Sequence, residues 1–96
     1  MRSNAEVLVT NGAGGSDLLR TANALAGRRF VAISNNAATN PIFVTIGGET
    51  PAAGVGVRVN ALSTIVLELG PQADLRAISP AGAQTPAGSG TDVSEW

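Results

Sequence analysis

The sequence predicts a small all-β domain, and three observations lead to this prediction. The apolar clusters are short, rich in Val and Ile, and closed by turn residues, and after the first gap they begin about every 8 to 16 residues. Apolar and polar residues alternate within them with the period of two that strands require. The chain has 96 residues, the length of one domain. We therefore expect a small antiparallel β-sandwich or barrel of about 7 strands with long Gly/Ala-rich loops.

Seven apolar clusters define the expected strands in chain order. Alternation is clearest in residues 64–69, where Ile65, Leu67 and Leu69 share one face. The clusters cover residues 7–10, 30–34, 42–46, 55–59, 64–69, 75–79 and 91–96.

Residues 28–48 hold the two strongest strand signals, joined by an Asn-rich turn. Residues 30–33 are apolar on both faces, and residues 42–46 are nearly so. Such strands either lie in the centre of a sheet or have their second face covered by another subunit. Both explanations are open from the sequence.

Turn residues separate the expected strands. Asn40 precedes Pro41, which favours an extended backbone at a strand start. Gly47 and Gly48 can supply positive φ angles. Residues 70–74 are expected to form a compact turn, and residues 82–90, which lack a large apolar side chain, a flexible loop.

Residues 16–27 fit two structures. Leucines and alanines follow a helical stripe, with Ser16 as N-cap and Gly27 just past the end. An isolated helix of about twelve residues is marginal, however. We favour a short strand at residues 18–21 followed by an irregular link.

The expected organisation is a single domain with two parts. Residues 1–27 form an N-terminal strand or arm that is partly irregular, and residues 28–96 form the β-sandwich core. We favour the arm, reaching a neighbouring subunit, because the first 16 residues are glycine-rich and few apolar residues anchor them.

The composition limits the chemistry of this chain. It has no His, Cys, Tyr or Lys, so no side chain of the usual types can activate a nucleophile or form an ordinary zinc site. The seven carboxylates are expected in turns or, for Glu6, Glu68 and Glu95, on strand positions that face solvent. We expect no catalytic residues, no cofactor and no metal site.

Charge and hydropathy argue against two classes of partner. The net charge is −1, and the six basic residues, all Arg, form no basic patch with interleaved aromatics, so we expect no nucleic-acid binding. No apolar run approaches a membrane span of about 20 residues, and the N-terminus lacks a signal-peptide core. A domain this small without disulfides or metal is expected to gain stability by self-association or by docking on a larger surface.

Six residues are candidates for an interface. Arg28 and Arg29 either clamp an acidic partner or keep a strand edge soluble. Trp96 either closes its own sandwich or anchors in a neighbouring subunit. An added strand at the N-terminus would use Val7, Leu8 and Val9.

Several motifs follow one another along residues 28–96. They are Arg-Arg-Phe-Val-Ala-Ile-Ser-Asn-Asn, Asn-Pro-Ile-Phe-Val-Thr-Ile-Gly-Gly, a Leu-rich strand, Leu-Arg-Ala-Ile-Ser and a closing Val-Ser-Glu-Trp. This order resembles the small β-rich virion structural proteins of tailed bacteriophages, which decorate or cement capsids or form head and tail appendages. The family pattern has no catalytic residues.

The resemblance implies a non-enzymatic capsid decoration or cement protein that binds the outside of the head and stabilises it. The implied partners are the major capsid protein or other virion proteins, with the chain as a trimer or dimer. The implied location is the capsid surface of the virion, after synthesis in the host cytoplasm. The alternative is a tail or head-fibre appendage module that binds a host receptor or glycan, although the chain has only three aromatic residues for a sugar site.

Overall fold

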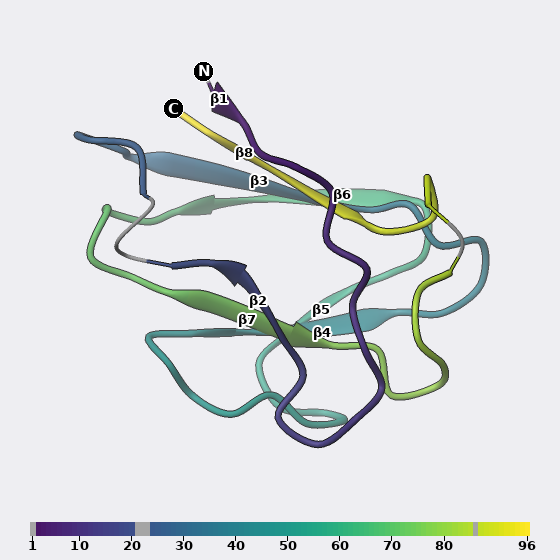
Figure 1. Cartoon of the computed structure of the whole chain (residues 1–96). Coiled ribbons are helices and arrows are strands. Elements are labelled where there is room, and N and C mark those ends of the chain that lie inside the picture. Colours follow the sequence, from purple (N-terminus) through teal and green to yellow (C-terminus); the bar gives the residue numbers. More distant parts are fainter. Residues whose placement is uncertain (1, 21–23, 86) are drawn as a thin grey trace.

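The computed structural model describes residues 2–20, 24–85 and 87–96 and confirms the predicted all-β fold. Eight strands form two four-stranded antiparallel sheets that pack face to face as two layers (Figure 1). The strands are β1 Arg2–Ser3, β2 Ser16–Leu19, β3 Phe30–Asn35, β4 Ile42–Ile46, β5 Val57–Val59, β6 Ser63–Glu68, β7 Leu75–Ile78 and β8 Thr91–Glu95.

The strand order places the two strongest predicted strands in different sheets. The upper sheet has the order β1-β8-β3-β6 and the lower sheet β2-β7-β4-β5. β3 lies between β8 and β6, and β4 lies between β7 and β5, so both are central strands. Central strands are paired along both edges, but in a two-layer sandwich the second face of each still lies on the outside of its sheet. Residues 36–41 therefore cross from one layer to the other and do not close a hairpin.

The core lies between the layers, where the alternating strand residues meet. Within β3, Val31 and Ile33 are fully buried, whereas Phe30 and Ala32 on the other face are only partly buried. Each fully buried aliphatic side chain contributes about 1.5–3 kcal/mol relative to exposure. The core residues are Val9, Leu18, Leu19, Val31, Ile33, Ile42, Val44, Val59, Leu75, Ala77 and Val93.

The described part of residues 1–27 supplies one strand to each sheet. β1 pairs with β8, the terminal strand, which brings the two ends of the chain side by side (Figure 1). β2 pairs with β7, and Val9 is fully buried in the core. This segment therefore packs against its own chain over its described length.

Of the two strands predicted in this segment, the first is wrong and the second is only partly covered by the described residues. Residues 7–10 form only an isolated bridge, between Val7 and Thr91. The strand fails because the chain leaves β8 there and turns toward β7, where Ser79 N–H donates to Thr10 O at 3.0 Å. Residues 16–27 begin with β2 and not with a helix, but part of the strand expected at residues 18–21 lies outside the described residues.

An irregularity in β2 explains why periodicity was ambiguous there. The pairing of β2 with β7 shifts register between Asp17 and Leu19. A bulge of this kind lets two consecutive side chains face the same layer. Leu18 and Leu19 are consequently both buried, which imitates the spacing of a helical stripe in the sequence.

Candidate interaction surfaces

Glu95 and Arg28 form a buried ion pair, which corrects the expectation that Glu95 faces solvent. Both side chains are fully buried, and Arg28 Nη1 lies 3.2 Å from Glu95 Oε2. Within β8, Thr91, Val93 and Glu95 share the inner face. The apolar Val93 two residues before Glu95 was the signal that could have predicted its burial.

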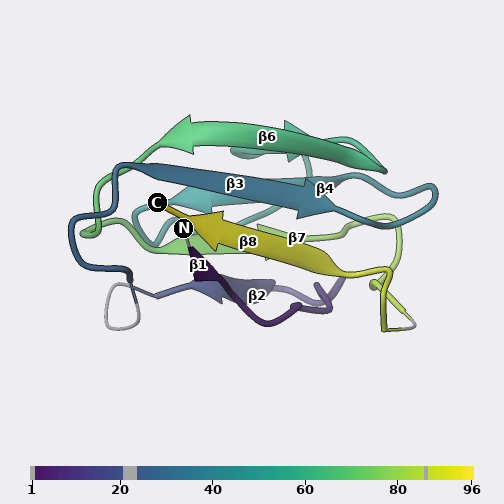
Figure 2. The same cartoon turned by 90° about the horizontal axis from the view of Figure 1, so that it is seen from above.

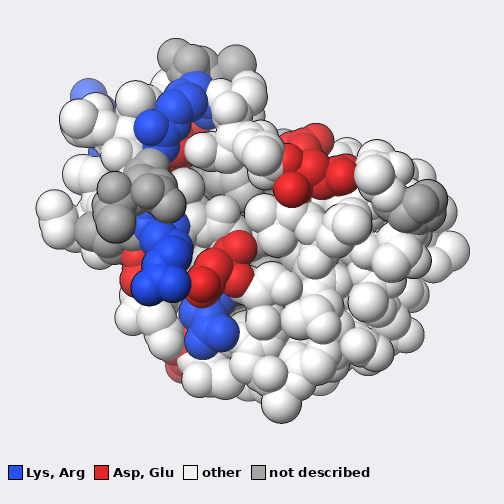
Figure 3. Space-filling model, viewed as in Figure 1, with Lys and Arg blue, Asp and Glu red and all other residues white. Residues whose placement is uncertain are grey.

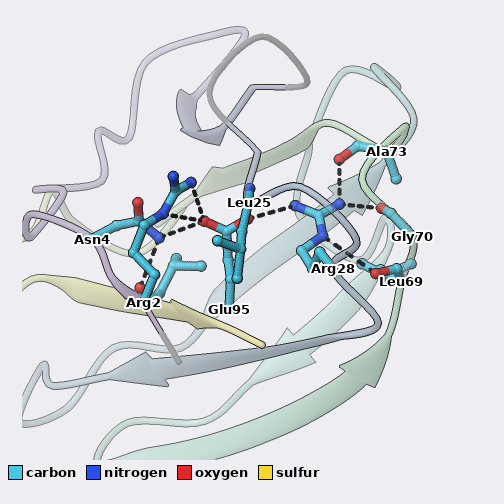
Figure 4. A network of polar contacts seen from close by, with 9 residues as sticks. Arg2, Asn4, Leu25, Arg28, Leu69, Gly70, Ala73 and Glu95 are labelled. Carbon is cyan, nitrogen blue, oxygen red and sulfur yellow. Dashed lines mark hydrogen bonds and ion pairs between the residues drawn. The ribbon is translucent and has the colours of Figure 1, made fainter.

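The Glu95 carboxylate accepts hydrogen bonds from two separate segments, the N-terminal residues and the loop before β3 (Figure 4). Arg2 Nη2 and Asn4 Nδ2 donate from the N-terminal segment at 2.6 and 3.0 Å, and Leu25 N–H donates from the loop before β3 at 2.8 Å. Burial alone would raise the pKa of Glu95, but the bonds from Leu25, Asn4, Arg2 and Arg28 lower it to about 2. The carboxylate is therefore ionised across the neutral range.

Arg28 is saturated by partners within the chain. Its guanidinium donates to the carbonyl oxygens of Leu69 at 3.2 Å and Ala73 at 3.0 Å, and also to that of Gly70 (Figure 4). These bonds join the turn between β6 and β7 to β8 through Glu95. Arg28 is thus part of the interior. The hypothesis that an arginine clamps an acidic partner therefore applies to Arg29 alone.

A second buried polar network, not foreseen from the sequence, lies at the other end of β3. Asn35 Nδ2 donates to Asn40 O and Val59 O, each at 3.0 Å, and its Oδ1 accepts from Gln84 Nε2 at 2.9 Å. Gln84 Oε1 accepts in turn from Thr91 Oγ1 at 3.0 Å. Because these amides are satisfied internally, the network fixes the loops and offers little to a ligand.

The outer face of the upper sheet carries an open aromatic pair. Trp96 stacks on Phe30 with ring centroids 5.9 Å apart and an interplanar angle of 27°. Trp96 nevertheless remains 41% exposed, and Val66 on the same face is 57% exposed. Arg29 is exposed, and its guanidinium carbon lies 6.0 Å from the Phe30 ring centroid. This surface, which we call the outer face, consists of Phe30, Ala32, Ser34, Thr64, Val66, Glu68, Asp92, Ser94 and Trp96.

The six predicted interface residues do not share one environment, and Arg28 is already accounted for by its buried ion pair with Glu95. Trp96 lies on the outer face and Arg29 borders it, because both side chains lie against the ring of Phe30. Val9 is in the core, Val7 is half-buried in its bridge to β8, and Leu8 between them is 44% exposed. The sequence identified the apolar content of residues 7–9 but not the direction of each side chain.

Charge is distributed unevenly over the surface. On the face shown in Figure 3, basic and acidic side chains gather toward the left, and the rest of that face is uncharged apart from one acidic group. Residues 79–90 contain no charged residue. A cavity of about 140 Å³ opens among these loops, lined by Ala37, Ala38, Thr39, Asn40, Gly82, Ala83, Gln84, Thr85 and Ser89. It offers small polar groups and no aromatic ring.

The carboxylates outside the buried pair differ in exposure. Glu68 is exposed as expected, whereas Glu6 is half-buried and accepts from Gly88 N–H at 2.9 Å and Gly90 N–H at 3.1 Å. Among the described residues, no three His, Cys, Asp or Glu side chains come close enough together to hold a metal ion.

Comparisons with family models, curated proteins and solved structures find no match to this chain. In the part of the chain that the structure describes, no helix has the length and apolar character needed to cross a membrane.

Proposed function

We propose that this protein is a non-enzymatic bacteriophage virion structural protein, a decoration or cement protein that binds the outside of the head and stabilises it. Two independent points support the proposal. The motifs of residues 28–96 resemble such proteins, and the sandwich carries an open aromatic surface that a protein partner can cover.

The outer face is the observation that carries the proposal. It combines a stacked Phe30–Trp96 pair, an adjacent Arg29 and an exposed Val66. Aromatic residues and Arg are enriched at protein interfaces, and a Trp is often among the few residues that carry most of the binding free energy. The occupant that we propose for this face is the major capsid protein.

The geometry of the face suits a flat contact. Ala32, Ser34 and Ser94 form the middle of the sheet surface beside the aromatic pair. Small side chains allow another backbone to approach closely, while the aromatic rings supply apolar area. Asp92 and Glu68 lie among the polar residues of the face and suit the solvent-accessible rim that surrounds such contacts.

A binding measurement with capsid shells tests the proposal. Because Trp96 is the single Trp of the chain, its fluorescence emission should shift to shorter wavelength when shells that lack the protein are added. Trp96→Ala should weaken co-sedimentation with shells at least about tenfold. The matched control is Arg58→Ala, because Arg58 is exposed on the lower sheet and its loss should leave shell binding unchanged.

Equal binding by both variants would refute the role of the outer face, and failure of the wild-type protein to bind any shell would refute the decoration role. Circular dichroism of Trp96→Ala separates lost binding from lost folding.

The second candidate is an appendage module that binds a host receptor or glycan. The uncharged loop cavity favours it, since Thr39, Asn40 and Ser89 place polar groups around a neutral hollow. Sugar sites usually add an aromatic platform, however, and both rings of the Phe30–Trp96 pair lie on the outer face. A glycan array with specific binding, lost on Asn40→Ala, would favour the appendage role.

A further inference from the structure

The free edge of β6 differs from the other three sheet edges. β1 has two residues, β5 has three and carries the exposed Arg58, and β2 has four with a register shift beside Asp17. Shortness, charge and irregularity are devices that keep a strand edge from pairing with another chain. β6 has six residues and a single charged one, Glu68. It is the outermost strand on its side of the upper sheet (Figure 2).

The backbone of β6 offers a regular set of hydrogen-bonding groups at this edge. Leu69 N–H donates to Arg29 O at 2.9 Å, next to the β3–β6 ladder. Along an antiparallel strand, every second residue hydrogen-bonds to the neighbouring strand, and the residues between them direct their backbone groups to the opposite edge. The N–H and C=O groups of Thr64, Val66 and Glu68 consequently point away from β3. Among the described residues, no strand pairs with this side of β6.

Apolar side chains are exposed on both faces of the same strand. Ile65 and Leu67 face the core but are only partly buried, because no strand lies beyond them. Val66 on the outer face is 57% exposed, and Leu62 just before the strand is 72% exposed. A strand added at this edge would cover apolar area on both sides of the sheet and satisfy the free backbone groups.

We propose that β6 pairs antiparallel with β6 of a second copy of this chain, which makes a two-fold symmetric dimer with a continuous eight-stranded sheet. The two-fold axis passes between the two copies of Val66. This register pairs Thr64 with Glu68 of the second copy, and Ile65 with its Leu67. With the axis at Val66, each of residues 64–68 is paired with a residue of the second copy.

Self-complementarity of β6 favours a second copy as the occupant, because Val66 pairs with its own copy and Ile65 with Leu67, so apolar side chains meet apolar ones. In the proposed register the only charged residue of each strand, Glu68, lies opposite a Thr hydroxyl and not opposite its own copy. Pairing about Glu68 would place two carboxylates side by side, which destabilises a cross-strand pair. The dimer does not depend on the proposed capsid role, because it rests on the edge of β6 alone.

Three variants at the paired positions test both the dimer and its register. Thr64→Glu places a carboxylate opposite Glu68 twice in the dimer and should raise the dimer dissociation constant about tenfold. Thr64→Lys places an ammonium there and should leave it unchanged or lower it. Both lose the same exposed hydrogen bond to Ser34, so they are matched in their effect on the monomer. Thr64→Glu combined with Glu68→Lys should restore the wild-type affinity.

Sedimentation velocity over a wide concentration range is the measurement, with circular dichroism to show that each variant is folded. We expect wild type to reach the mass of two chains. A wild-type protein that stays monomeric, or that forms trimers, overturns the proposal. A dimer that responds equally to Thr64→Glu and Thr64→Lys also overturns it, because the interface then lies elsewhere.

Discussion

At the scale of single residues, Glu95 makes the stability of the protein depend on pH. Its pKa is about 2 in the folded chain against an ordinary value of 4.5. Between these values the unfolded chain binds more protons, so the free energy of unfolding rises with pH. This contribution, about 3 kcal/mol, is complete above about pH 5 and is lost as the pH falls toward 2.

Denaturant unfolding at a series of pH values from neutral to strongly acidic checks this prediction. Glu95→Gln should remove this part of the pH dependence and, by leaving Arg28 buried without its carboxylate, cost about 3–5 kcal/mol at neutral pH. The matched control, Glu68→Gln, changes an exposed strand carboxylate and should change stability by less than about 0.5 kcal/mol. Parallel pH profiles for wild type and Glu95→Gln would contradict the account.

Leu62 is the second residue with a consequence for stability. Its φ is +57°, and it is the one non-Gly residue in this region of backbone space among those described. A left-handed conformation costs most residues about 1–2 kcal/mol, whereas Asn tolerates it better. Because the Leu62 side chain is mostly exposed, Leu62→Asn should raise the free energy of unfolding by about 0.5–1 kcal/mol. A loss of stability in thermal unfolding would show that the leucine packs in solution.

At the scale of elements, two glycines of the segment before β5 have different requirements. Gly56 has φ +91°, and a Cβ there would lie 2.2 Å from Val44 O on the neighbouring strand. Gly54 has φ +77° with no atom within 4 Å of the same position. Gly54→Ala should cost about 1 kcal/mol from the backbone alone, and Gly56→Ala at least about twice that, since the β4–β5 pairing must also shift. Equal costs in denaturant unfolding would contradict this close approach.

Most strands of the fold could be predicted from the sequence because alternation is local. Residues 42–46 match β4 throughout, and the other clusters from residue 30 onward each overlap one observed strand. The strand predicted at residues 7–10 is wrong, because this segment is irregular. Val9 is buried in the core although the segment is not paired as a strand. The bulge beside Asp17 let residues 16–27 fit a helix as well, although the strand favoured at residues 18–21 overlaps β2.

The pairing of strands and the polar interior could not be predicted. Neighbours in sequence such as β3 and β4 lie in different sheets, and no turn residue encodes that choice. The Arg28–Glu95 pair joins residues 67 positions apart, so composition alone assigned both charges to the surface. For the candidate surface, the sequence identified Arg29 and Trp96. That both lie against Phe30 depends on the β3–β8 register.

At the scale of the whole molecule, the C-terminal strand completes the upper sheet. β8 lies between β1 and β3, and its Glu95 holds the N-terminal segment and Arg28 together. The same strand ends at Trp96, so the buried ion pair and the exposed aromatic pair are positioned by one element. The outer face is therefore presented in part by a strand that is paired on both sides and held by a buried ion pair, which limits the ordering cost of a contact there.

The free edge of β6 and the outer face are neighbouring surfaces of the same sheet. A dimer through β6 would place two outer faces side by side, doubling the area available to a symmetric shell. Two linked sites bind more tightly than one when the spacing on the shell matches. A variant that is monomeric in sedimentation but binds shells as wild type does would separate the two proposals.

Cryo-electron microscopy of the particle that carries this protein, compared with the same particle lacking it, tests the central claim most directly. The account predicts ordered density at capsid lattice positions, with Phe30 and Trp96 facing the major capsid protein. Density confined to a vertex, tail or fibre, or a lattice contact made by another face of the sandwich, would contradict it.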